Sequence, residues 1–250
     1  DEISDAPVEF KIEERFIPNP LAYWESERQE TFFTTGGLAA VHVDSRSREG
    51  VWEAFKRRET YGTSGPRILL WFDLITDNGL VPMGSEITVD ENPTFQVKAV
   101  GSFKQKPGCP EYNLGKRSAE DIKKLCMNEC FNPSSERYAI SRIEIIKVLP
   151  EINALENPEE LIMDPWKTFE CDKNKATCKI RFQDEDFVSE NREATFYVRA
   201  IQEPTERING KNLRCTYDDE GNCIETNFCY GGYKTDIEDN CISMSEERAC

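Results

Sequence analysis

The chain has 250 residues, of which 38% are hydrophobic and 31% charged, and this composition is typical of a globular protein rather than a disordered one. Its formal net charge of -16, from 47 acidic against 31 basic residues, repels phosphate backbones and anionic membranes, so we expect no nucleic acid partner. No apolar run is long enough to span a bilayer, because the longest candidates, such as Ile68 to Phe72, have the length of a strand.

The first part of the chain predicts an irregular segment followed by one strand and one helix. Residues 1–35 contain Pro18 and Pro20 and show no sustained periodicity. The apolar run 38–43 predicts a short buried strand. Ser47 is a suitable helix N-cap and Gly62 a suitable C-cap, and the apolar stripe of the helix consists of Val51, Trp52 and Phe55. One strand and one helix cannot form a domain alone, so we interpret them as the last unit of an α/β body.

The second part of the chain is dominated by predicted strands. Alternation is clear where Phe95, Val97 and Ala99 share one face, which is the period of a half-buried strand. A short helix is expected over 118–127, and the run 243–249 has a helical character. We therefore predict an α+β, mainly β fold with a β-sandwich-like C-terminal domain. Its predicted strands are 67–73, 94–100, 140–149, 177–182 and 195–203.

Ten cysteines, all at or after Cys109, indicate an oxidising compartment, because reducing cytosol gives little reason to keep so many. We therefore expect a periplasmic or extracellular protein. Four of the ten, Cys109, Cys126, Cys130 and Cys250, could form two bridges or have their partners on the missing chain. The alternative is zinc held by Cys109, Cys126 and Cys130 plus one more ligand, although the spacing is not a paired C-x2-C arrangement. Short spacing suggests these pairs, although sequence cannot determine connectivity: Cys171 with Cys178, Cys215 with Cys223 and Cys229 with Cys241.

Several sequence motifs, in order, carry a resemblance to a known family. The longest runs from Gly36 to Arg67, beginning Gly-Gly-Leu-Ala-Ala-Val-His-Val-Asp, and the others are 81–84, 141–147 and 196–204. Together they closely resemble an uncharacterised, mostly bacterial family, the domain of unknown function 3604 (DUF3604). Complete members resemble a PHP-type barrel, named for polymerase and histidinol phosphatase domains, followed by a β-rich domain.

This resemblance implies that the chain is the C-terminal portion of a larger, exported, metal-dependent hydrolase. Residues 1–65 would then be the remnant of the barrel, with its closing strand and helix, and residues 66–250 a disulfide-linked accessory domain. The metal-binding motifs of the family should lie upstream, since none occurs in this sequence. The resemblance therefore implies no cofactor in this chain, a divalent metal in the upstream barrel, and the upstream part of the same protein as partner.

No self-contained catalytic site is evident from the residue types. His42 is the only histidine, and a hydrolytic metal site normally takes several His or carboxylate ligands. Because His42 lies within a predicted strand, we interpret it as a packed or hydrogen-bonded residue. A serine triad also needs a histidine base, so we reject a Ser-His site at Ser64. The sequence therefore leaves the catalytic residues unknown.

Four other segments could carry a function, and each also has a structural interpretation. The turn with Thr63, Ser64 and Arg67 could lie near an anionic substrate group, although a domain junction is the simpler reading. The carboxylates 184–186 are interpreted as solvated surface, and 218–222 as a turn around Gly221. A calcium loop frame occurs over 236–247, but Cys241 stands where such a loop requires glycine.

Two functions remain open from the sequence. In the first, the intact protein uses metal-activated water to hydrolyse an ester bond in an unknown small-molecule substrate. This chain would then cover the barrel and shape the entrance to its active site. In the second, the acidic β-rich domain is a non-catalytic extracellular binding or structural module. The fold alone cannot decide between them.

Overall fold

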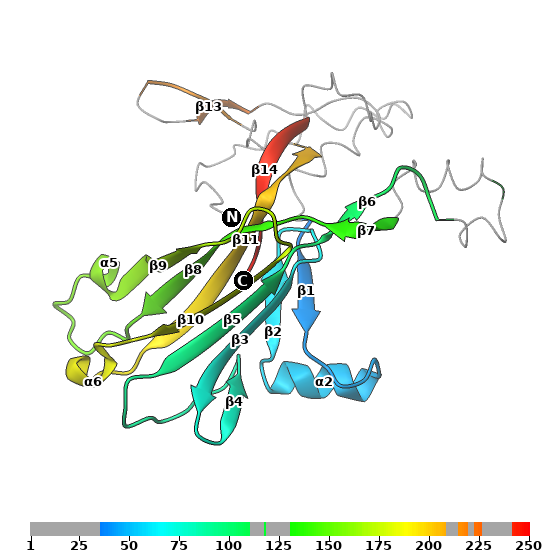
Figure 1. The fold of residues 1–250 in the computed structure, drawn as a ribbon. Helices are drawn as coiled ribbons and strands as arrows, with labels where there is room; N and C mark the ends of the chain where they lie inside the picture. The colour runs from blue at the N-terminus through cyan, green and yellow to red at the C-terminus, as the bar shows by residue number, and fades with distance from the viewer. Residues whose placement is uncertain (1–35, 111–117, 119–130, 209–214, 220–222, 227–241) are drawn as a thin grey trace. The chain divides into compact units, whose positions relative to one another are not determined.

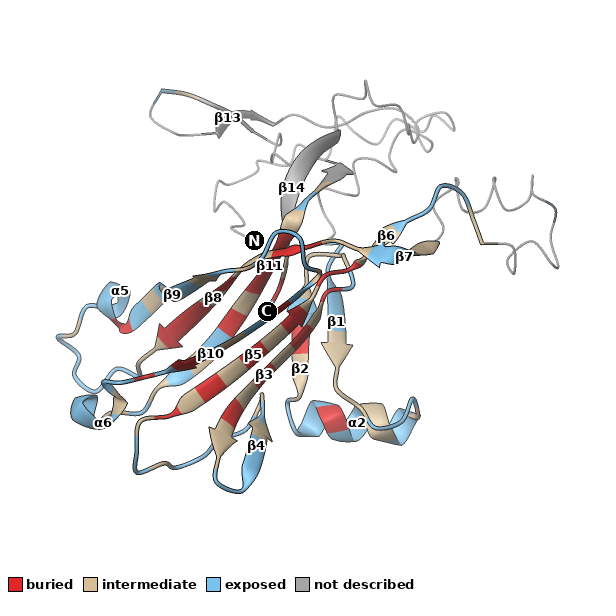
Figure 2. Cartoon of the chain, viewed as in Figure 1, coloured by how far each residue is buried: buried red, intermediate tan, exposed pale blue. Residues whose placement is uncertain are grey.

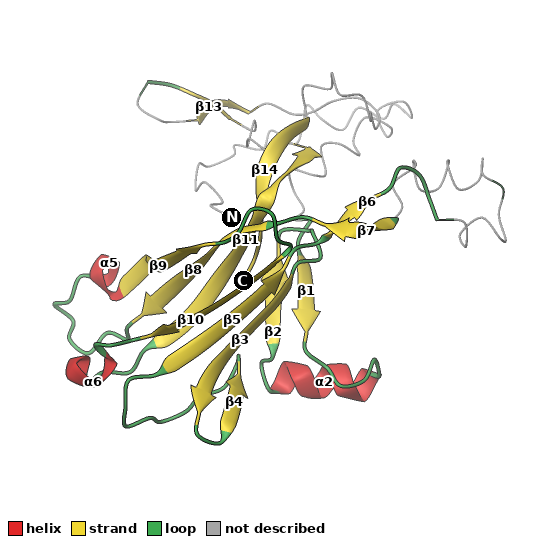
Figure 3. Ribbon diagram, in the orientation of Figure 1, coloured by secondary structure: helices red, strands yellow, loops and turns green. Residues whose placement is uncertain are grey.

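The computed structural model describes residues 36–110, 118, 131–208, 215–219, 223–226 and 242–250. The chain divides into two units, one of residues 37–203 with 246–250 and the other of residues 1–36 with 204–245. Figure 3 shows that strands dominate the described part, and the strand pairs described there are antiparallel. The predicted mainly β character is therefore confirmed.

Two larger sheets are formed mainly by residues 37–203 and 246–250 (Figure 1). The four-stranded sheet has the order β10-β5-β3-β4, with bounds Thr177–Gln183, Thr94–Val100, Leu69–Thr76 and Gly79–Pro82. The six-stranded sheet has the order β1-β2-β14-β11-β8-β9, with bounds Leu38–Val41, Thr60–Thr63, Ile242–Ala249, Thr195–Ile208, Ile140–Val148 and Ile162–Glu170.

The remaining elements are short. Two small antiparallel sheets pair β6 with β7 and β12 with β13, with bounds Phe103–Gln105, Pro133–Arg137, Cys215–Tyr217 and Cys223–Thr226. Three described helices are α2, α5 and α6, with bounds Arg48–Lys56, Pro158–Leu161 and Phe187–Glu190. None of the helices in the described part of the chain has the length and apolar character that crossing a bilayer requires.

One hydrophobic core is shared by the two larger sheets. Figure 2 shows the alternation of buried and less buried residues along β3 and β5, where every second side chain enters the core. The core residues from the four-stranded sheet include Leu70, Phe72, Leu74, Phe95, Val97, Ala99 and Phe182, and those from the six-stranded sheet include Ile143, Ile145, Val198 and Ala200. Burial of these side chains provides the main favourable term for folding, at about 25 cal/mol per Å² of apolar area.

The alternating patterns located the central strands correctly. The predicted strand 94–100 coincides with β5, and the strands predicted at 67–73, 140–149, 177–182 and 195–203 correspond to β3, β8, β10 and β11. The helical reading of 243–249 is wrong, because this segment is strand β14. Ala249 pairs with Thr63, and Cys250 and Gly62 exchange two backbone hydrogen bonds, so strand pairing overrides local helix propensity. The helix predicted over 118–127 lies, apart from Ser118, outside the described residues.

Helix α2 begins where the sequence predicts and ends earlier. The Ser47 hydroxyl accepts a hydrogen bond from Gly50 N at 3.0 Å, which confirms the N-cap. The expected C-cap at Gly62 is wrong, because the helix ends at Lys56 and Gly62 lies in β2. Arg58, with φ of 59°, takes the left-handed conformation that ends the helical path.

The strand and helix that the sequence assigned to an α/β body are only partly buried, which is one of the two arrangements expected for an isolated strand and helix. Strand β1 has β2 as its antiparallel partner and stands at the end of the six-stranded order, so the buried strand expected there is an edge strand. Trp52 is 61% and Phe55 49% exposed, and the buried residue of the helix is Ala54. The helix is therefore covered at Ala54, whereas its two large rings remain largely exposed. The PHP-type barrel itself stays a prediction.

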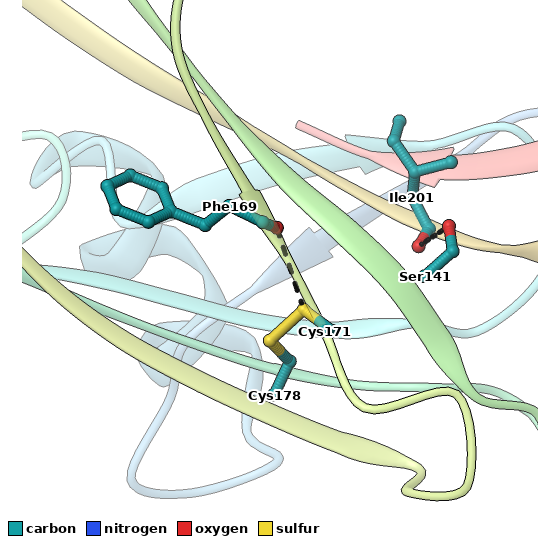
Figure 4. The surroundings of a disulfide bond; sticks show 5 residues. All are labelled: Ser141, Phe169, Cys171, Cys178 and Ile201. Atoms are coloured by element: carbon teal, nitrogen blue, oxygen red, sulfur yellow. Dashed lines mark hydrogen bonds between the residues drawn. A yellow bond between two sulfur atoms is a disulfide. The ribbon is translucent and has the colours of Figure 1, made fainter.

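A disulfide joins the two larger sheets (Figure 4). Cys171 directly follows β9 of the six-stranded sheet, and Cys178 lies in β10 of the four-stranded sheet, with a Cα–Cα distance of 5.8 Å. This confirms the first predicted pair. Cys109 is also disulfide-bonded, which argues against zinc at Cys109, whereas Cys250 is a free, exposed thiol. The pair Cys215 and Cys223 stays a prediction, and Cys126, Cys130, Cys229 and Cys241 lie outside the described residues.

Candidate functional site

The turn proposed as a substrate contact is held by backbone and side-chain pairing. Thr63 Oγ1 accepts a hydrogen bond from Gly65 N at 3.2 Å. The Ser64 hydroxyl accepts from Arg248 N at 3.0 Å, and Ser64 N donates to Arg248 O at 3.0 Å. The Arg67 guanidinium lies 3.8 Å from the ring centroid of Phe131. Thr63 and Ser64 thus connect β2 to β14, which agrees with the structural reading of the turn, and their proximity to a substrate stays a prediction.

A polar pocket of about 500 Å³ lies instead where β1 ends and α2 returns to β2. It opens beside the outer face of the four-stranded sheet, which is the face directed away from the core. Trp71 and Asp73 of β3 alternate with the core residues Leu70 and Phe72, and this alternation places them on the outer face. We call this the His42 pocket, and its lining residues are His42, Val43, Asp44, Arg57, Glu59, Trp71, Asp73, Pro82 and Met83.

The His42 ring is positioned by a hydrogen bond and two aromatic neighbours. Its Nε2 lies 2.9 Å from the carbonyl oxygen of Leu70. A carbonyl oxygen only accepts, so His42 donates from Nε2 in this hydrogen bond and Nδ1 is the ring nitrogen not engaged by Leu70. The ring centroids of Tyr61 and Trp71 lie 5.5 and 5.8 Å from that of His42. His42 is therefore packed and hydrogen-bonded, as expected, and it also forms part of a pocket wall.

An ion pair forms another part of the lining. Arg57 donates from Nε to Glu59 Oε1 at 2.8 Å and from Nη2 to Glu59 Oε2 at 3.1 Å, which is a bidentate arrangement. The hydrogen bond from Arg57 lowers the pKa of the Glu59 carboxyl, and the same hydrogen bond raises the pKa of Arg57. Since this pair neutralises itself, Asp44 and Asp73 leave the lining with a net negative charge.

The two pocket residues that come from β3, Trp71 and Asp73, also have polar or charged neighbours. Gln96 donates from Nε2 to Asp73 Oδ2 at 3.2 Å, and Lys98 Nζ lies 4.5 Å from the ring centroid of Trp71. Sequence reasoning missed Asp44, Arg57, Glu59, Trp71 and Asp73. The alternation along 69–76 is a signal that could have found Trp71 and Asp73, because a tryptophan on the polar face of a strand is unusual in a simple solvated sheet.

The residue types of the lining determine what the pocket can do chemically. Within the described ranges, no group of three or more His, Cys, Asp and Glu residues lies close enough to hold a metal ion. The lining sets the apolar surface of Val43, Trp71, Pro82 and Met83 beside charged and polar groups, so it is more polar than that of a typical small-molecule site. The calcium frame starting at Asp236 and the turn at Gly221 lie largely outside the described residues.

A second polar cluster, around Lys147, is buried in the core. Asp184 is fully buried, so the reading of 184–186 as solvated surface is wrong at this residue, whereas Glu185 and Asp186 are exposed. Lys147 Nζ lies 2.7 Å from Asp184 Oδ2 and 2.5 Å from Glu190 Oε2, and 5.2 Å from the ring centroid of Trp166. The ammonium group is the reason that a carboxylate can be buried here.

The protonation of Lys147 indicates a structural role. Desolvation lowers the pKa of Lys147, but the hydrogen bonds and charges of Asp184 and Glu190 outweigh it and raise the pKa above its usual value. A lysine that acts as a nucleophile or base needs a lowered pKa. Lys147 comes from β8 and Asp184 from the segment after β10, so the ion pair connects the two larger sheets.

The fold and the pocket define a mainly β, antiparallel protein with a disulfide-linked core and a polar pocket beside one sheet. Residues 6–107 match the family model described as "Protein of unknown function (DUF3604)", which supports the resemblance that the sequence motifs indicate. The motifs at 141–147 and 196–204 lie outside this match. All residues that line the His42 pocket lie within it.

One curated relative has a local similarity to the chain. A stretch of 61 residues is 38% identical to an uncharacterised protein of Chlamydia pneumoniae. The stretch covers 24% of this chain and 9% of the length of that protein, so the activity of the whole relative cannot be transferred from it. No solved structure matches the chain.

Proposed function

We propose that this chain is the C-terminal, non-catalytic part of a metal-dependent hydrolase that resembles PHP-type enzymes, and that it binds ligand through the His42 pocket. The observation that carries the proposal is that the pocket is lined entirely by residues of the segment that matches the DUF3604 model. The upstream barrel would supply the divalent metal, since this chain has a single histidine.

The residue types that line the pocket support a binding role. Trp71, Pro82 and Met83 provide apolar surface, and Asp44 and Asp73 provide hydrogen-bond acceptors at its edge. The His42 ring is held at Nε2 by Leu70, and Nδ1 is the ring nitrogen that Leu70 does not engage. In the intact protein these groups would orient a substrate while the metal activates water elsewhere.

A second candidate function is a non-catalytic extracellular module with a β-sandwich fold. It is favoured by the Cys171–Cys178 disulfide between the two sheets and by the core that the sheets share. A periplasmic or extracellular location, which both candidates require, is part of the proposal. In this case the His42 pocket would bind a ligand that no part of the protein hydrolyses.

Activity and metal measurements on the whole chain test the non-catalytic role. We expect no hydrolysis of 4-nitrophenyl acetate or 4-nitrophenyl phosphate above the blank, with manganese or zinc added. We also expect no stoichiometric transition metal after purification. Turnover that His42→Ala abolishes would overturn the proposal.

The binding role has its own reporter, because the chain contains one histidine. A fragment library is added to the whole chain, and the ring signals of His42 are followed by NMR. We expect at least one class of fragments to shift these signals, and Asp73→Asn to weaken that binding. The matched control is Asp77→Asn, which changes an exposed carboxylate in the turn after β3. Fragments that bind without moving the His42 signals would contradict this site.

A further inference from the structure

The outer face of the four-stranded sheet carries a cluster of cations beside the His42 pocket. The strand register aligns Trp71, Lys98 and Lys179 in one cross-strand row. The next row aligns Asp73, Gln96 and Arg181. These two rows contain three cations, Lys98, Lys179 and Arg181, and we refer to these three residues as the basic rows. Together with Gln96, Val97 and Ile180 they line a shallow depression of about 360 Å³.

The basic rows form a positively charged patch on a protein with a negative net charge. The chain has 47 acidic residues against 31 basic ones, so an average surface cation has many carboxylates available. In the part of the chain that the structure describes, none of the three cations forms a salt bridge. Lys98 also stands directly opposite Lys179, an arrangement that destabilises a sheet unless an anion is present.

The geometry of a sheet brings these cations within reach of one ligand. Directly opposite residues have Cβ atoms roughly 5 Å apart, and diagonal neighbours roughly 7–8 Å apart. Trp71 restrains one of the cations, because Lys98 Nζ lies over its ring at 4.5 Å. Gln96 donates to Asp73, so the Gln96 amide and Lys98 are both held in place on this face by contacts with β3.

From this geometry we infer that the basic rows bind a small oxyanion, with a phosphate or carboxylate group between Lys98, Lys179 and Arg181. Two ammonium groups and one guanidinium match the several oxygens of such a group, and the guanidinium can donate to two of them. This goes beyond the proposed function, because the ligand is an anion and its site lies outside the negatively charged lining of the His42 pocket.

The competing explanation is that these residues only protect an edge. Strand β10 stands at the end of the four-stranded order, and charged side chains on edge strands hinder pairing with other chains. That explanation accounts for Lys179 and Arg181 but not for Lys98, which lies on an inner strand. It predicts aggregation of the charge-neutral variants and no oxyanion binding by the native chain.

Calorimetry on the whole chain at low ionic strength tests the inference, with inorganic phosphate and citrate as separate probes. We expect at least one probe to bind with one-to-one stoichiometry and to be displaced by added salt. Lys179→Gln/Arg181→Gln should weaken that binding about tenfold or more, because two charge-assisted hydrogen bonds are lost. The matched control Lys173→Gln/Lys175→Gln removes the same charge from the loop before β10 and should change affinity less than about twofold.

The arms of the experiment separate the outcomes. Phosphate binding without citrate binding identifies a phosphate site, and the reverse identifies a carboxylate site. The lack of binding of both probes overturns the inference, as does equal weakening by the two double variants.

Discussion

Replacing Lys147 with methionine should destabilise the protein strongly, because the change leaves a buried carboxylate without its cation. The Lys147 side chain is 1% exposed and that of Asp184 is 0% exposed, so water cannot replace the lost partner. Removing one member of such a pair costs about 3–5 kcal/mol. For a chain of this size that corresponds to a fall in the melting temperature on the order of 10 °C.

A double-mutant cycle separates the ion pair from general packing. Asp184→Leu alone should cost less than Lys147→Met, because Glu190, whose side chain is 32% exposed, still partners the ammonium group. The double variant Lys147→Met/Asp184→Leu should lie within about 1–2 kcal/mol of the native protein, since two apolar groups replace the pair. The assay is urea denaturation followed by tryptophan fluorescence, for which the nearby Trp166 is a local probe.

The surface control is Glu185→Gln, which changes the exposed carboxylate next to Asp184 and should cost less than about 1 kcal/mol. Two results would refute the reasoning about the buried pair. One is a cost below about 1 kcal/mol for Lys147→Met, and the other is a double variant whose loss equals the sum of the two single losses.

Three further outcomes are expected from the structure. Because the pKa of Lys147 is raised in the folded state, its contribution to stability is complete below its usual pKa of 10.5 and is lost as pH rises through the folded pKa. If the denaturation midpoint of Lys147→Met fell above pH 10.5 as much as that of the native protein, Lys147 would not be the source of this pH dependence. Gly101→Ala should lower the melting temperature by several degrees, because an added Cβ would lie 1.9 Å from the Tyr138 carbonyl oxygen, whereas Gly62→Ala, with its nearest atom at 4.0 Å, should change it little. Cys171→Ser should cost about 2–3 kcal/mol by chain-entropy arguments for this short loop, and peptide mapping without reductant should recover Cys171 linked to Cys178 from the native chain.

Patterns among residues close together in the sequence were sufficient to predict a central strand, a helix N-cap and one disulfide. The alternation of Phe95, Val97 and Ala99 is sufficient to locate β5, because a strand with one buried face requires a period of two. The N-cap at Ser47 and the Cys171–Cys178 pair also depend on residues close in the sequence. The family resemblance rested on short ordered motifs, and the match over 6–107 supports it.

Contacts between residues distant in the sequence decided the rest. The segment 242–249 is a strand because its end pairs with β2, and this pairing outweighs its local helix propensity. Asp184 lies in the core because Lys147, 37 positions earlier, supplies its counter-charge. The His42 pocket likewise joins residues from 42 to 83, which no local period connects. The sequence by itself therefore determined which segments are strands with one apolar face. Only the tertiary structure decided which polar side chains meet, because their partners are selected by sheet pairing and by the cost of burying a charge alone.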